Sequence, residues 1–86
     1  MDTRKLIGWN LRGLRVARGL SQERLALEAG IDRAYVGRVE RGSENVTVAV
    51  LEKIAAVLGV PVATLFAEVD GNDPYPDPLP SGRKVK

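Results

Sequence analysis

The sequence predicts an all-α fold of five short helices followed by a proline-rich C-terminal tail. Apolar residues recur at helical spacing over most of the chain, and side chains that favour helix starts and glycines that favour helix ends separate these runs. No segment alternates apolar and polar residues with the period of two that is typical of a β-strand. We therefore expect a compact all-helical domain.

The first two predicted helices are separated by a glycine and a serine. One face of the first helix carries Ile7, Leu11 and Leu14. Gly19 ends this helix, because glycine readily adopts the left-handed conformation found at helix C-termini. Ser21 is a natural N-cap for the second helix, and Gly30 ends it. The apolar residues of this second helix are Leu25, Ala26 and Ala29.

The third predicted helix begins after Asp32, which is placed to cap it, and ends at Gly42. Val36 and Val39 are spaced to face inward from this helix.

Two further helices complete the predicted domain. Thr47 can cap the fourth, which ends before Gly59. Its nearly continuous apolar stripe consists of Leu51, Ile54, Ala55 and Leu58. Pro61 suits the first turn of a very short fifth helix that contains Leu65 and Phe66.

The composition changes sharply near residue 70. Residues 1–69 are rich in leucine, valine, alanine and charged residues, whereas residues 70–86 contain all but one of the five prolines and few apolar side chains. Such a segment cannot bury enough surface to offset its ordering entropy. We expect a helical domain over residues 1–69 and a flexible tail over residues 70–86.

The residue types that are absent exclude several classes of function. The chain of 86 residues has no cysteine and no histidine, which rules out disulfides, cysteine-based zinc sites and the commonest metal ligand and general base. The hydroxyls of Ser21, Ser43 and Thr47 and the scattered carboxylates form no nucleophile–base pattern. We expect neither enzymatic activity nor a metal or cofactor. Since no run of about 18 apolar residues occurs, we expect a cytoplasmic protein without a membrane partner.

Residues 20–42, which read LSQERLALEAGIDRAYVGRVERG, contain the most informative pattern. Two adjoining short helices need a small residue at their closest approach, a residue with positive φ at the turn, and an apolar residue after it. Ala26, Gly30 and Ile31 meet these needs in order. The spacing predicts a helix-turn-helix.

At this point the sequence resembles the Cro/repressor, or Xre, family of helix-turn-helix proteins. The matching residues are Leu20, Ser21, Gln22, Glu23, Leu25, Ala26, Ala29, Gly30, Ile31, Tyr35, Val36, Glu40 and Gly42. Residues 48–66 look like the closing pair of helices of that family, so the resemblance covers residues 5–68. It implies a five-helix, lambda-repressor-like domain and a sequence-specific transcriptional regulator, most often a repressor, that binds double-stranded DNA.

The resemblance also implies roles for individual residues. The helix from Arg33 to Arg41 would enter the major groove. By position, the base-reading residues are Arg33, Ala34 and Arg38. Each arginine could donate two hydrogen bonds to a guanine and Ala34 could contact a thymine methyl, which predicts a guanine-containing half-site. The expected phosphate contacts are Gln22, Tyr35, Arg41, Ser43 and Asn45.

Other positions serve the fold or a subunit contact in this interpretation. Arg15 and Glu40 match an ion pair that often joins the first and third helices of the family. The candidate dimer contacts are Trp9, Val62, Leu65 and Phe66. Trp9 can equally fold over the edge of the domain, and the other three can equally complete the core. A homodimer on an inverted-repeat operator is favoured, because one short helix reads too few base pairs for useful specificity.

The local charge is compatible with DNA, and several regulators share the expected fold. Residues 10–41 hold seven arginines and four acids, a local charge of +3 in a chain of net charge +2. Besides a stand-alone repressor, the open alternatives are a restriction-modification control protein, a phage or mobile-element regulator, an antitoxin with a protein partner, and an interaction adaptor that has lost DNA binding.

Overall fold

The computed structural model describes residues 2–69. This part of the chain forms the helices α1 (Thr3–Ala17), α2 (Gln22–Ala29), α3 (Arg33–Arg41) and α4 (Val48–Leu58), followed by the 3-10 helix η1 (Val62–Phe66). The predicted all-α fold is confirmed, and no strand occurs within residues 2–69. The fifth helix is of the 3-10 type, and Pro61 caps it from outside instead of occupying its first turn. The prediction of a flexible tail concerns residues 70–86, which lie outside the described residues.

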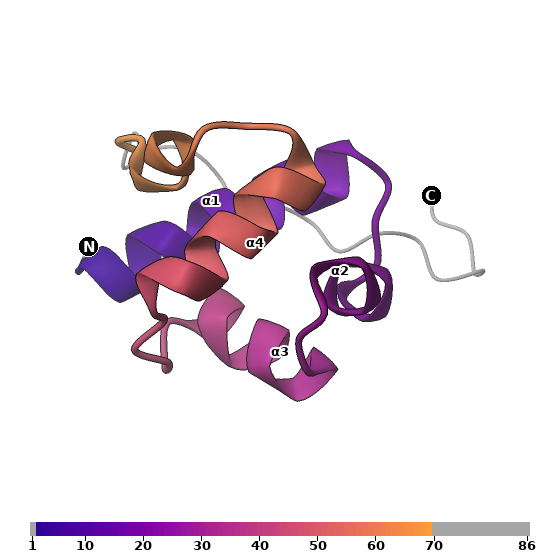
Figure 1. Ribbon diagram of the computed structural model, residues 1–86. Coiled ribbons are helices and arrows are strands. Elements are labelled where there is room, and N and C mark those ends of the chain that lie inside the picture. The colour runs from indigo at the N-terminus through magenta and orange to yellow at the C-terminus, as the bar shows by residue number, and fades with distance from the viewer. Residues whose placement is uncertain (1, 70–86) are drawn as a thin grey trace, which may run out of the picture.

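The helices pack in pairs around one centre. α1 contacts α3 and η1, α2 contacts α3 and α4, and α4 also contacts η1. In Figure 1, α3 runs along the lower edge of the molecule, whereas η1 lies at the upper left beyond α4. The helix-turn-helix and the end of the domain that closes the core therefore lie on opposite sides.

All five helical segments contribute to the hydrophobic core. Its buried residues are Ile7, Leu11, Leu25, Ala26, Val36, Val39, Leu51, Ile54, Ala55, Leu58 and Leu65. Leu14, Leu20 and Ile31 pack against this cluster from its edge. Each fully buried leucine or isoleucine contributes roughly 1.5–3 kcal/mol through burial of its side chain. The stability of so small a domain thus depends on a few large aliphatic residues.

The predicted helix caps are confirmed. Ser21 Oγ accepts a hydrogen bond from the Arg24 N–H at 2.9 Å, and Asp32 Oδ2 accepts one from the Ala34 N–H at 3.0 Å. Thr47 Oγ1 accepts from the Val50 N–H at 3.1 Å. These bonds satisfy backbone donors that have no partner inside the helix. Local chemistry therefore sets where α2, α3 and α4 begin.

A close approach of α1 to α3 requires a glycine that the sequence pattern did not single out. A Cβ atom on Gly8 would lie 2.5 Å from the carbonyl oxygens of both Val39 and Glu40. Real Cβ atoms do not come this close to backbone oxygens, so any side chain here would push the two helices apart. Gly8 thereby allows α1 to support the C-terminal half of α3.

Candidate nucleic-acid interface

The turn between α2 and α3 has the geometry that the sequence predicts. Gly30 adopts the left-handed conformation with a φ of 71°, and the N–H of Ile31 donates to the Ala26 carbonyl at 2.9 Å. Ile31 packs against the core, and Ala26 is buried where the helices meet. The turn therefore holds α3 in one orientation relative to α2, with its N-terminus at Arg33.

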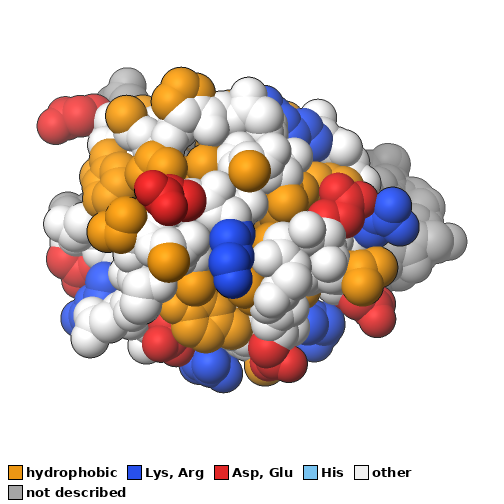
Figure 2. All heavy atoms as spheres, in the orientation of Figure 1, with side chains coloured by type: hydrophobic (Ala, Val, Ile, Leu, Met, Phe, Trp, Pro, Cys, Tyr) orange, Lys and Arg blue, Asp and Glu red, His pale blue; other side chains and the backbone are white. Residues whose placement is uncertain are grey.

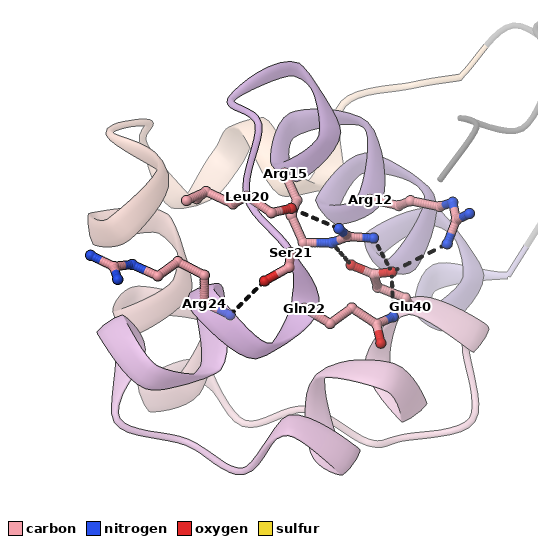
Figure 3. Close-up of polar contacts among 7 residues, drawn as sticks. All are labelled: Arg12, Arg15, Leu20, Ser21, Gln22, Arg24 and Glu40. Carbon is pink, nitrogen blue, oxygen red and sulfur yellow. Dashed lines mark hydrogen bonds and ion pairs between the residues drawn. The ribbon is translucent and has the colours of Figure 1, made fainter. Parts of the chain in front are cut away.

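A buried carboxylate joins α1, α2 and α3 behind the helix-turn-helix (Figure 3). Arg15 Nε donates to Glu40 Oε2 at 2.6 Å and Arg15 Nη2 donates to Glu40 Oε1 at 3.0 Å, a bidentate pair whose residues are each only 4% exposed. Arg15 Nη1 also donates to the Leu20 carbonyl at 2.8 Å. The ion pair expected between these two residues thus has its charges and donors matched, as a buried pair requires.

Two more side chains converge on the same carboxylate. Gln22 Nε2 donates to Glu40 Oε1 at 2.9 Å, and Arg12 Nη1 lies 3.5 Å from the same oxygen. Arg12 did not emerge from the sequence pattern, although it lies one helical turn before Arg15 and so on the same face of α1. Gln22 was expected at a phosphate. Since an amide carries two N–H donors, its bond to Glu40 leaves one for such a contact.

The outer edge of α3 carries exposed cations. Arg33, Ala34 and Arg41 are exposed, and neither Arg33 nor Arg41 forms an ion pair with another residue of the described 2–69 segment. Fewer arginines are available to bind DNA than the sequence count indicates, because carboxylates pair with several of them. Within residues 2–69 the arginines in ion pairs are Arg12, Arg15, Arg24 and Arg38.

Arg38 is held by neighbours on two sides. Its Nε donates to Glu44 Oε1 at 2.8 Å, and its guanidinium carbon lies 5.6 Å from the centre of the Tyr35 ring, within the range of a cation–π contact. The hydrogen bond to the Glu44 carboxylate raises the pKa of Arg38 above its ordinary value. Tyr35 itself is half-buried and packs against the core. Glu44 was absent from the sequence-based candidates.

The loop after α3 holds the remaining expected phosphate contacts. Ser43 and Asn45 are both exposed, and the Ser43 hydroxyl donates to the Arg38 carbonyl at 3.2 Å. This bond fixes the Ser43 side chain against the end of α3, while the oxygen keeps its capacity to accept. Asn45 lies two residues further along the same loop.

The four candidate dimer contacts occupy different environments. Leu65 is fully buried in the core, so its assignment to a subunit contact is wrong: the short η1 turns this residue inward to cover α1 and α4. Phe66, by contrast, is 41% exposed, and Val62 and Trp9 are half-buried. Figure 2, in the orientation of Figure 1, shows hydrophobic side chains gathered at the end of the molecule where η1 lies.

Asn10 explains how η1 is held against α1. Its Nδ2 donates to the carbonyls of Leu65 at 3.0 Å and Ala67 at 2.8 Å. Both amide hydrogens are thus used on the backbone of a segment more than fifty residues away in the sequence. The contact could not be predicted from local pattern, because nothing near Asn10 indicates its partner.

The described residues 2–69 contain neither a metal-binding cluster nor a helix that could span a membrane. Within residues 2–69, no three histidine, cysteine, aspartate or glutamate side chains are grouped so that they could hold a metal ion. The helices of the same segment are too short or too polar for any of them to cross a membrane.

Comparison with known proteins places this arrangement among DNA-associated regulators. Residues 11–65 match the family described as Helix-turn-helix. A hypothetical transcription factor of Neisseria meningitidis is 48% identical over 59 residues, which cover 69% of this chain and 56% of the relative. This chain therefore spans little more than half of that relative's length.

Two solved structures are similar over most of the described fold. The restriction-modification controller protein C.AhdI from Aeromonas hydrophila has a TM-score of 0.72 and 48% identity, and the match covers 73% of this chain and 96% of that one. The master regulator for biofilm formation SinR, solved in complex with DNA, has a TM-score of 0.68 and 37% identity, covering 71% and 98%.

Proposed function

The chain belongs to the helix-turn-helix family, and we propose that it regulates transcription by binding double-stranded DNA sequence-specifically, with α3 in the major groove. One observation carries this proposal. The inner face of α3 is fixed by the core and by the Glu40 network, while its outer edge presents Arg33 and Arg41, which form no ion pair with any other residue of segment 2–69. A rigid helix with an exposed cationic edge is what base readout in the major groove requires.

In this proposal the residues of the interface divide into two roles. Arg33, Ala34 and Arg38 contact base edges, the arginines by bidentate donation to guanine O6 and N7. Phosphates are contacted by Gln22, Tyr35, Arg41, Ser43 and Asn45, which position the protein without reading sequence. Gln22 also lies at the N-terminus of α2, where the helix dipole favours an anion.

A homodimer would place two copies of the short helix α3 on the DNA, and together they would contact more base pairs than one copy can. The proposed contact is the exposed ring of Phe66 together with Val62, and Trp9 extends it along α1. Because η1 lies away from α3, two copies joined at this end could both present their recognition helices to one duplex (Figure 1). Two inverted half-sites in the operator would follow from the symmetry of such a dimer.

Similarity to C.AhdI favours one specific regulatory role. That protein is a restriction-modification controller, and the match extends over nearly its whole length. Control of a restriction-modification system is therefore the second candidate, within the same DNA-binding activity. The function proposed here is binding and repression, without a catalytic step.

Selection from a random duplex library tests the proposal. The purified full chain is used at one near-physiological salt concentration, since affinity for DNA depends steeply on salt. We expect enrichment of two inverted half-sites, each containing guanine and centred about one helical turn apart, roughly 34–36 Å. If no sequence is enriched, the proposal fails, and an interaction adaptor or a partner-dependent antitoxin becomes the better account.

A further inference from the structure

We infer that Glu44 is a positioning residue for Arg38: its carboxylate orients the guanidinium toward one guanine and thereby sets specificity at that base pair. The inference rests on the proposed function, because it takes α3 to lie in the major groove. The family resemblance implies no role for Glu44. What singles out Glu44 is its contact with Arg38, a candidate base-reading side chain.

The backbone after α3 brings Glu44 back over the helix that it follows. Gly42 ends α3 in the left-handed conformation, with a φ of 78°. The Ser43 N–H and hydroxyl then both donate to the Arg38 carbonyl, at 3.0 Å and 3.2 Å. As a result, the same turn fixes the main chain of Arg38 and delivers the Glu44 carboxylate to its side chain.

The position of the hydrogen bond on Arg38 matters for what the guanidinium can still do. Glu44 occupies Nε, and the Tyr35 ring lies beside the guanidinium group. The Nη1 and Nη2 atoms form the far edge of the fork, and their N–H groups are the donors that a bidentate contact to guanine O6 and N7 needs. Glu44 and Tyr35 thus restrict the rotation of a long side chain without consuming this edge.

Such restriction has a measurable consequence for discrimination. An arginine that is free in the unbound protein loses rotamer freedom when it binds a base, at a cost that corresponds to about two- to tenfold in affinity. Prior restriction by Glu44 removes part of that loss for the correct base. The Arg38 side chain remains 43% exposed in the pair, so its far edge is accessible to a ligand.

The same carboxylate has the opposite effect on binding to arbitrary DNA. A negative charge beside the groove repels phosphates whatever the sequence. If Glu44 served only the fold, its removal would relieve this repulsion and leave discrimination unchanged. A positioning role therefore predicts two opposite changes when Glu44 is removed. The affinity for arbitrary DNA rises, and the discrimination at the base pair of Arg38 falls.

The test compares Glu44→Ala, Glu44→Gln and Glu52→Ala with the wild type. Glu52 is exposed on α4, so its replacement removes the same charge away from α3. The probes are the duplex that the wild type enriches, its single base-pair variants and a scrambled duplex, all at one salt concentration. Arg38→Ala first identifies the base pair that Arg38 reads, and thermal unfolding verifies that each variant is folded.

We expect Glu44→Ala to bind the scrambled duplex about twofold more tightly and to lose about two- to tenfold of its discrimination at the base pair of Arg38. Glu44→Gln should keep most of this discrimination, because its amide oxygen can still accept from Nε. Glu52→Ala should change neither quantity. In an Arg38→Ala background, Glu44→Ala should have no further effect on discrimination.

Three results would overturn the inference, and each is separable from a failure of the proposed function. Unchanged or improved discrimination in Glu44→Ala would mean that Glu44 restrains Arg38 without orienting it. An effect that persists in the Arg38→Ala background would mean that Glu44 contacts a base itself, for instance a cytosine amino group. Discrimination that Arg38→Ala leaves intact would remove Arg38 from base reading. If the wild type enriches no sequence at all, the proposed function fails and this inference fails with it.

Discussion

At the scale of single residues, Glu40 connects the stability of the domain to its proposed DNA-binding surface. It is buried, it accepts from two arginine nitrogens of α1, and it also accepts from Gln22 at the start of α2. The carboxylate therefore balances the charge of the buried Arg15 guanidinium and positions a side chain that is proposed to contact phosphate. Both effects depend on the same few atoms.

Removal of this carboxylate should destabilise the domain strongly. We expect Glu40→Ala to lower the free energy of unfolding by about 3–5 kcal/mol, because Arg15 would remain buried without a counter-charge. Urea denaturation measures the change. Glu28→Ala is the matched control, since its ion pair with Arg24 is exposed and should contribute no more than about 1 kcal/mol. Equal losses in the two variants would contradict the structural role of Glu40.

Base-reading and phosphate-contacting residues should differ in how their loss depends on sequence. Arg33→Ala should cost about 1–3 kcal/mol on the enriched duplex and relax the preference at one base pair. Gln22→Ala should weaken binding to enriched and scrambled duplexes by a similar factor. Titrations of both duplexes at one salt concentration make the comparison. Equal losses on the two duplexes for Arg33→Ala would remove this residue from base readout.

At the scale of helices, local chemistry determines where each helix begins and ends. Packing between helices determines which side chains fit at each position. Ser21, Asp32 and Thr47 cap α2, α3 and α4 through bonds to residues two or three positions away. Contacts between helices follow different constraints. The carbonyls of Val39 and Glu40 lie against Gly8 of α1, where no side-chain atom could fit.

A pair of glycine substitutions tests this contact. Gly8→Ala should lower the free energy of unfolding by about 1–3 kcal/mol, because its methyl group would overlap the backbone of α3. Gly37→Ala is the control within another helix. Its Cβ would meet nothing closer than Arg41 Nη1 at 3.3 Å, the end of a flexible side chain, so a neutral effect or a gain of up to about 1 kcal/mol is expected. A tolerated Gly8→Ala would refute the close approach.

The helices could be predicted from the sequence, but most contacts of the site could not. Caps and helix ends depend on neighbouring residues, so Ser21, Gly30 and Asp32 could be assigned from the chain alone. Glu44 meets Arg38 only because the turn after α3 reverses the chain, and Asn10 meets a segment more than fifty residues away. The sequence leaves Leu65 open between the core and a subunit contact, because η1 is too short for periodicity to show which side faces the core.

At the scale of the whole molecule, the arrangement separates a proposed DNA-binding side from a proposed dimer side. α3 and η1 lie at opposite ends of the view in Figure 1, and both contact α1. α1 therefore connects the two sides through a contact with α3 at Gly8 and a contact with η1 at Asn10. Such an arrangement allows a dimer contact to set the separation of two recognition helices.

Self-association should depend on the exposed aromatic ring at the η1 end. We expect Phe66→Glu to weaken dimer formation about tenfold or more, because a charge would replace apolar surface that the proposed dimer buries. Sedimentation equilibrium measures the monomer–dimer constant. Leu27→Glu is the control, because Leu27 is also an exposed apolar residue but lies on α2. Dimerisation of Phe66→Glu at the wild-type affinity would place the contact elsewhere.

Methylation interference on the enriched duplex tests the central claim most directly, namely that α3 reads guanines from the major groove. Dimethyl sulfate methylates guanine N7, the major-groove atom that a bidentate arginine would contact. The account predicts that methylation of one or two guanines in each half-site blocks binding, and that Arg33→Ala or Arg38→Ala abolishes the effect at one of them. Tight, sequence-selective binding that no guanine methylation disturbs would contradict it.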